Sequence, residues 1–201
     1  MERLGNPALA PREHYTYRQY RTWPDSERWE LIDGHAWSMC AAPTPRHQGL
    51  VGKLHLDLAA ALKGKPCKVY LSPFDVLFPR NDEPDDEVDT VVQPDLVVIC
   101  DKSRITRRGG RGAPDLVVEI LSPSTSRKDQ NEKHRLYERS GVREYWVIDP
   151  AAASVWRYRL LPEGGFDEGE LRQPYFEYGP IDSAVVPGFT IKPEDLFADL
   201  D

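Results

Sequence analysis

The hydrophobic positions of the chain repeat in two ways, and the longer repeat predicts the first of two substantial helices. One helix is expected over residues 44–64, where apolar residues recur three or four positions apart. Thr44 would cap this helix, and Pro45 would occupy its first turn. A second helix is expected over residues 127–140 and would end before Gly141.

Shorter apolar runs predict strands between and after these helices. Residues 29–32 and 35–39 flank Asp33-Gly34, a two-residue hairpin signal. Further strands are expected over residues 67–71, 75–78, 91–100, 115–121, 143–149 and 154–160, with the run at 91–100 interrupted by Pro94. Residues 101–113 are expected to form a basic loop. Together these elements indicate one α/β domain over residues 1–201, with a mixed central β-sheet flanked by helices, an N-terminal β-hairpin and a C-terminal β-rich extension.

One strand carries a residue that its hydrophobic pattern does not explain. The run at residues 114–122 is apolar on both faces, which is typical of the middle of a covered sheet. Glu119 lies within it. A carboxylate there loses its hydration and needs a cation, a hydrogen-bond donor or a proton. A metal ion would satisfy this need.

Composition excludes several classes of protein. The chain has 201 residues, of which 40% are hydrophobic and 29% are charged, and no apolar run is long enough to span a membrane. Residues 1–12 lack the apolar stretch of a secretory signal, so we expect a cytoplasmic protein. Cys40, Cys67 and Cys100 form no metal-binding pattern, and we expect them to be buried thiols and not disulfides.

Charge is distributed unevenly along the chain. The net charge of −7 argues against a protein that coats nucleic acid non-specifically. Every charged residue over positions 82–101 is acidic, whereas positions 102–139 carry ten Lys or Arg against five Asp or Glu. A solvated loop and helix face explain any single one of these charges. The group also suggests a surface for an anionic ligand, whose candidate phosphate contacts are Arg104, Arg107, Arg108, Arg111, Arg127 and Lys128.

Two other carboxylates could join Glu119. Asp95 follows Pro94 at the entry of an apolar strand, and Glu30 lies on the first hairpin. Alone, Asp95 would be a turn residue, and Glu30 could equally form a salt bridge. If Asp95 and Glu119 lie on adjacent strands, however, their oxygens can converge on the kind of site that Mg²⁺ prefers.

The second helix offers an amine beside these carboxylates. Its apolar residues are few, which suggests that one face borders a polar cleft. Lys133 shares that face with Gln130 and Tyr137 and could orient a water for phosphodiester hydrolysis. A pair with Asp129 is the simpler explanation for Lys133 alone. His47, in the first turn of its helix, could face the cleft near Glu30 or simply be hydrogen-bonded at the helix start.

These residues resemble a known family. Pro94-Asp95, the run from Glu119 to Thr125, Lys133 with Tyr137, and residues 141–149 are similar to the Uma-type restriction endonuclease family of the PD-(D/E)xK nuclease superfamily. Residues 30–34, Met39 and His47-Gln48 match its N-terminal pattern, so the resemblance spans residues 15–191. It implies a restriction-endonuclease-like core with Mg²⁺, or Mn²⁺, at the open end of the sheet. Its metal ligands would be Asp95, Glu119, the backbone carbonyl of Ile120 and, as an accessory, Glu30.

The chain departs from the superfamily pattern at one position. Leu121 stands two residues after Glu119, where the pattern places lysine, so Lys133 would supply the amine. The spacing from Lys133 to Tyr137 resembles a Gln-xxx-Tyr helix motif of some nucleases in the superfamily. We therefore expect a Mg²⁺-dependent endodeoxyribonuclease with Asp95, Glu119 and Lys133 as catalytic residues. The alternative is a nuclease-fold module that binds nucleic acid or a protein without cleaving. In either case an exposed edge at residues 155–160 could support a homodimer.

Overall fold

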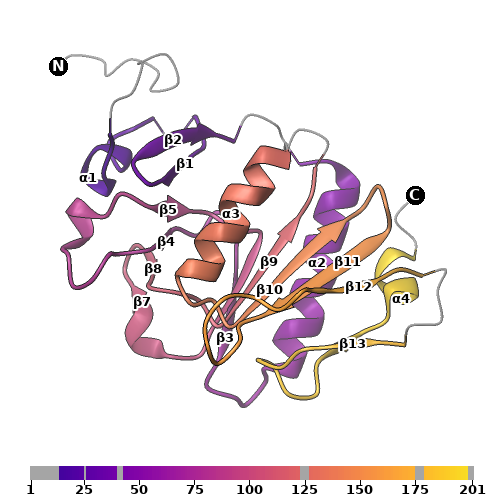
Figure 1. Cartoon of the computed structure of the whole chain (residues 1–201). Coiled ribbons are helices and arrows are strands. Elements are labelled where there is room, and N and C mark those ends of the chain that lie inside the picture. The colour runs from indigo at the N-terminus through magenta and orange to yellow at the C-terminus, as the bar shows by residue number, and fades with distance from the viewer. Residues whose placement is uncertain (1–13, 25, 40–42, 123–126, 175–178, 199–201) are drawn as a thin grey trace.

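The computed structural model describes residues 14–24, 26–39, 43–122, 127–174 and 179–198, and the side chains of residues 127–130 lie outside this description (Figure 1). The described residues form two six-stranded sheets, a small two-stranded sheet and four α-helices. The predicted α/β class is confirmed. No helix among the described residues is both long and apolar enough to cross a membrane.

The larger core is built on a mixed sheet in the middle of the molecule. Its β9 and β10 are parallel, and all its other neighbouring strands are antiparallel. The strand order is β12 (Glu170–Arg172), β11 (Ser154–Arg159), β10 (Glu144–Asp149), β9 (Leu116–Ile120), β6 (Leu96–Ile99) and β3 (Lys68–Leu71).

The two long helices cover opposite faces of this sheet (Figure 1). Helix α2 (Pro45–Ala61) packs its leucine stripe against alternate residues of β6, β9 and β10. Helix α3 (Arg127–Arg139) packs Leu136 and Tyr137 on the other face, against Val97 and Val117. The expected N-cap of α2 is confirmed, because the Thr44 hydroxyl accepts a hydrogen bond from the His47 amide.

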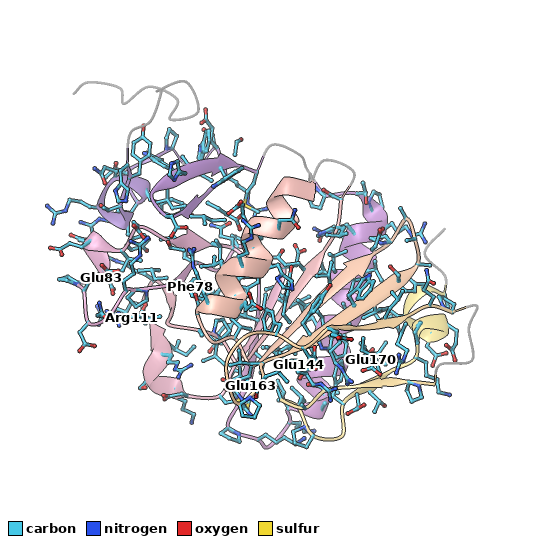
Figure 2. The ribbon with its side chains drawn as sticks, viewed as in Figure 1. Phe78, Glu83, Arg111, Glu144, Glu163 and Glu170 are labelled. Carbon is cyan, nitrogen blue, oxygen red and sulfur yellow. A yellow bond between two sulfur atoms is a disulfide. The ribbon has the colours of Figure 1, made fainter. Side chains whose placement is uncertain are left out.

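The second sheet lies beside α3 and contributes to the same core. Its strands, in order, are β2 (His35–Ser38), β1 (Trp29–Ile32), β5 (Val91–Val92), β4 (Val76–Leu77), β8 (Gly109–Arg111) and β7 (Ile105–Thr106). Val76 and Val92 pack with Leu136 of α3, and α1 (Tyr17–Tyr20) covers the outer side around Leu31. Phe78 points from this sheet toward α3 (Figure 2). The C-terminal segment adds β13 (Ile181–Asp182), β14 (Thr190–Ile191) and α4 (Pro193–Phe197).

The predicted N-terminal hairpin is confirmed. Strands β1 and β2 pair antiparallel through a two-residue turn, in which Asp33 has φ 50° and Gly34 has φ 75°. Both angles are left-handed, as a type I′ turn requires. The turn fixes the register of β1 and therefore the position of Glu30.

The run at residues 91–100 is not the single strand that its hydrophobicity suggested. It forms β5 in one sheet and β6 in the other, with Gln93, Pro94 and Asp95 between them. Proline donates no backbone hydrogen bond, so strand pairing ends there and the chain can pass between sheets. Residues 101–113 are likewise not a plain loop, because β7 and β8 form a hairpin within them.

Two further expectations were wrong. Cys67 and Cys100 form a disulfide across the antiparallel strands β3 and β6, whose register places the two residues opposite each other. That pairing depends on contacts between segments 33 residues apart, which residue spacing alone did not reveal. Residues 155–160 are no exposed edge, because β11 pairs with β10 on one side and β12 on the other. Cys40 lies outside the described residues.

Candidate active site

Two carboxylate residues, Asp95 and Glu119, lie opposite each other where β6 begins beside β9. Leu96 of β6 pairs with Val118 of β9, so the antiparallel register sets Asp95 opposite Glu119. Asp95 Oδ2 accepts hydrogen bonds from the backbone amide of Ile120, at 2.8 Å, and from His47 Nε2, at 3.2 Å. The strand pairing and these two donors hold the Asp95 carboxylate beside Glu119.

Helix α3 and strand β1 complete the cluster around Glu119. Lys133 Nζ donates to Glu119 Oε1 at 3.0 Å and to Glu30 Oε1 at 2.9 Å. The Tyr137 hydroxyl, one helical turn further along, donates to the same Glu119 oxygen at 2.6 Å. Glu30 and Lys133 are 2% and 8% exposed, so this ion pair lies largely out of water, where the stronger Coulomb attraction is offset by lost hydration.

Burial shifts the proton affinities of this cluster. Loss of hydration is the main reason that the pKa of Glu119 rises to about 7, and the negative charges of Asp95 and Glu30 raise it further. Lys133 and the Tyr137 hydroxyl oppose this rise. The hydrogen bond to Asp95 raises the pKa of His47 above its ordinary value. The carboxylates therefore share a site where a cation would be strongly favoured.

The donor set fits a magnesium ion. Asp95 Oδ1 and Glu119 Oε2 accept no hydrogen bond from the described residues, and each belongs to a carboxylate whose other oxygen is held in place. Within the part of the chain that the structure describes, no three His, Cys, Asp or Glu side chains are grouped for metal binding. Two carboxylates, a backbone carbonyl and water would suit Mg²⁺, which keeps much of its hydration shell.

The predicted site residues fall into two groups in the structure. Asp95, Glu119, Lys133, Tyr137 and Glu30 come together, and His47 and Ile120 join them through Asp95. His47 contacts Asp95, although the sequence suggested a place near Glu30. The side chains of Gln130, Arg127 and Lys128 lie outside the described residues.

The other predicted basic residues lie in the segment that joins the end of β6 to the start of β9. These strand ends are the ones far from Asp95 and Glu119. Arg107 and Arg108 are exposed at the turn between β7 and β8. Arg104 bonds to the Ala113 carbonyl, whereas Arg111 bonds to Asp85 and to the carbonyl of Glu83. Figure 2 shows Arg111 and Glu83 together at the margin of the molecule. The structure therefore does not bring these arginines to the carboxylates.

Sequence reasoning missed the contribution of Gln93. Its backbone amide donates to Glu30 Oε1 at 2.8 Å, so Glu30 is held by both Lys133 and this amide. Gln93 directly precedes Pro94-Asp95, and that proximity was the one available signal. The donor is a backbone amide, which almost every residue type has, and its partner is 63 residues away. The identity of residue 93 therefore could not predict this contact.

Comparisons with known proteins identify the family and the fold of the chain. A family model described as "Uma2: Putative restriction endonuclease" matches residues 17–194. An uncharacterised protein, slr1290, from Synechocystis is 24% identical over 159 residues, which cover 79% of this chain and 77% of that protein. The crystal structure of a "putative nuclease belonging to DUF820" from Anabaena variabilis superposes with a TM-score of 0.72 at 22% identity, covering 92% of this chain and 98% of the other. At that identity, the likeness shows a shared fold.

Proposed function

Because the chain belongs to the Uma2 family, we propose that it is a metal-dependent endonuclease that hydrolyses phosphodiester bonds of DNA. One observation supports this most. Asp95, directly before β6, lies opposite Glu119 of β9 in the strand register, and Lys133 of α3 donates to Glu119 at 3.0 Å. A pair of carboxylates and an amine is the set that the PD-(D/E)xK pattern requires.

In this proposal Asp95, Glu119 and the Ile120 carbonyl would hold Mg²⁺ or Mn²⁺. The bound ion would supply Lewis-acid stabilisation of the charge that develops on the scissile phosphate. His47 and the Ile120 amide keep Asp95 oriented, as partners of a ligand typically do. Tyr137 does the same for Glu119.

Lys133 has the role of the displaced lysine. Its ammonium lies 3.0 Å from Oε1 of Glu119, a carboxylate that would hold the metal ion. There it would orient an attacking water and stabilise negative charge in the transition state. Glu30, which the sequence suggested as an accessory ligand, has contacts that favour a different role. It binds Lys133 and the Gln93 amide, and we assign it the positioning of Lys133.

Nicking of supercoiled plasmid tests the proposal. We expect activity with Mg²⁺ or Mn²⁺ and none in EDTA. Glu119→Ala and Lys133→Met should each lower the rate about 100-fold or more, the range for loss of a catalytic proton-transfer or charge-stabilising group. Glu163→Ala is the matched control, because Glu163 is exposed on a loop at the foot of the molecule (Figure 2). Nicking that survives Glu119→Ala would refute the assignment.

The second candidate is a module that binds nucleic acid or a protein without cleaving. Leu121 at the usual lysine position favours it, as does the Lys133 ammonium held by two carboxylates. If this candidate is correct, calorimetry should detect no Mn²⁺ binding at Glu119. The parent protein and Glu119→Ala should then give the same heats. A Glu119-dependent heat of binding would exclude this candidate and favour the nuclease.

A further inference from the structure

A second polar site includes Gln93, whose backbone amide also holds Glu30. A pocket of about 510 Å³ opens between α1, the start of β1 and the segment that links β5 to β6. This volume lies within the usual range for small-molecule sites, about 300–1,000 Å³. Trp29 and Gln93 line the pocket, and they precede Glu30 and the Pro94-Asp95 pair in the chain. Besides the loss of hydration, the charge of Glu30 raises the pKa of Asp75, so the pocket lies on the Glu30 side of the carboxylate cluster.

The pocket combines aromatic walls with a network of polar groups. Trp23 contributes a half-buried ring that contacts Tyr20 and Trp29, with ring centroids 5.5 Å and 5.9 Å apart. Gln93 Nε2 donates to Asp75 Oδ1, at 2.8 Å, and to the Tyr20 hydroxyl. Gln93 Oε1 accepts from Arg28, at 2.9 Å. These contacts fix the polar edge of the pocket.

Asp75 is the acceptor that this network presents to a ligand. Its Oδ1 accepts from Gln93 and Tyr20, and Tyr17 also hydrogen-bonds to this carboxylate, whose two oxygens can accept further donors. Loss of hydration raises the pKa of Asp75, so a donor that replaced its lost water would stabilise the charged carboxylate. Arg21 and Arg28 are exposed at the rim and could contact a phosphate.

We propose that this pocket binds an unstacked nucleobase of the substrate strand next to the scissile phosphate, and that it favours bases with an exocyclic amino group. The ring would stack on Trp23, and its amino group would donate to Asp75. Aromatic stacking with a carboxylate acceptor is a general way to hold an extruded base. The proposal rests on the proposed nuclease function, because it takes the neighbouring cluster as the reaction centre.

Binding of deoxynucleoside monophosphates in EDTA tests the pocket without the reaction. Calorimetry on the full chain should rank dGMP, dAMP and dCMP above dTMP, with deoxyribose 5-phosphate weakest. Trp23→Ala should weaken dGMP binding about fivefold or more, from the contribution of one stacked base. Asp75→Asn should narrow the difference between dGMP and dTMP to less than about threefold, because a bond to a charged acceptor is lost. Leu56→Ala and Asp57→Asn, both on the exposed side of α2, are the controls.

Each outcome separates the pocket from the catalytic proposal. Equal binding of dGMP and deoxyribose 5-phosphate by the parent protein would overturn the proposal that the pocket binds a nucleobase, whatever the plasmid assay shows. Unchanged dGMP affinity in a folded Trp23→Ala protein would also overturn it. Conversely, base-dependent binding by a protein that never nicks DNA would support the pocket while refuting the nuclease.

Discussion

At the scale of single residues, Glu119 concentrates the conflict between stability and function. It is held in a covered sheet by Lys133 and Tyr137, yet burial raises its pKa to about 7. A buried carboxylate costs folding free energy when it is charged. The proposed role as a metal ligand needs this ionised group in spite of its cost. Functional sites commonly sacrifice stability in this way.

Glu119→Gln should therefore stabilise the metal-free protein at alkaline pH. The pKa of Glu119 is about 7 in the folded chain against an ordinary value of 4.5. Between these values the folded state binds more protons than the unfolded state, so the parent loses stability as the pH rises. Glutamine has no such proton to lose. Urea unfolding in EDTA should show an advantage of about 1–3 kcal/mol at pH 8 that nearly disappears at pH 4.5. An advantage that is the same at both pH values would contradict this.

At the scale of elements, the β1–β2 hairpin places Glu30 for its contact with Lys133. Its turn is tied into the fold, because the Gly34 amide donates to the Asp89 carbonyl and its carbonyl accepts from the Tyr15 amide. The positive φ of Gly34 is easy only for a residue without a side chain. A change in the turn should therefore reach the ion pair four residues away.

Gly34→Ala should lower the free energy of unfolding by about 1–2 kcal/mol, the usual cost of a left-handed alanine. An added Cβ would also lie 2.2 Å from the His14 ring, which would have to move. Gly52→Ala is the matched control, since this helical glycine has nothing within 4 Å of an added Cβ. The control should gain about 0.5–1 kcal/mol. Thermal melting of both variants measures the contrast, and equal melting temperatures would argue against a strained turn.

At the scale of the whole molecule, acidic and basic segments partly neutralise each other. Arg111 binds Asp85, and Arg21 lies within ion-pair distance of Asp86, so the acidic stretch is anchored to its surroundings. The exposed Arg107 and Arg108 remain the stronger candidates for phosphate contacts, since Arg104 and Arg111 are committed to intramolecular bonds. Arg107 and Arg108 lie at the turn of the β7–β8 hairpin. DNA that contacted both this hairpin and the carboxylate cluster would extend along the second sheet.

The double variant Arg107→Ala/Arg108→Ala tests whether DNA contacts the β7–β8 hairpin. If both arginines contact phosphates, the slope of log affinity against log salt should become shallower by about 2. Affinity should fall for all DNA sequences alike, because phosphate contacts carry no sequence information. The control is Lys53→Ala/Lys63→Ala, on and just after α2, which covers the other face of the central sheet. An unchanged salt slope would remove the hairpin from the DNA path.

The sequence by itself determined the features that depend on near neighbours in the chain. The spacing of leucines predicted α2, Asp33-Gly34 predicted the hairpin, and a lone carboxylate in an apolar run singled out Glu119. Helix period, turn angles and strand alternation are local properties, so residue order encodes them directly. The family resemblance, which is also carried by residue order, indicated the fold class.

Only the tertiary structure decided how distant segments meet. It divided residues 91–100 between two sheets and paired Cys67 with Cys100. It also brought Glu30 into an ion pair with Lys133, 103 residues away. It also formed the pocket between Trp23 and Gln93. Such contacts follow from the packing of whole faces, where burial and hydrogen bonding of many residues are satisfied together. No local pattern specifies which of several suitable partners a buried charge will bind.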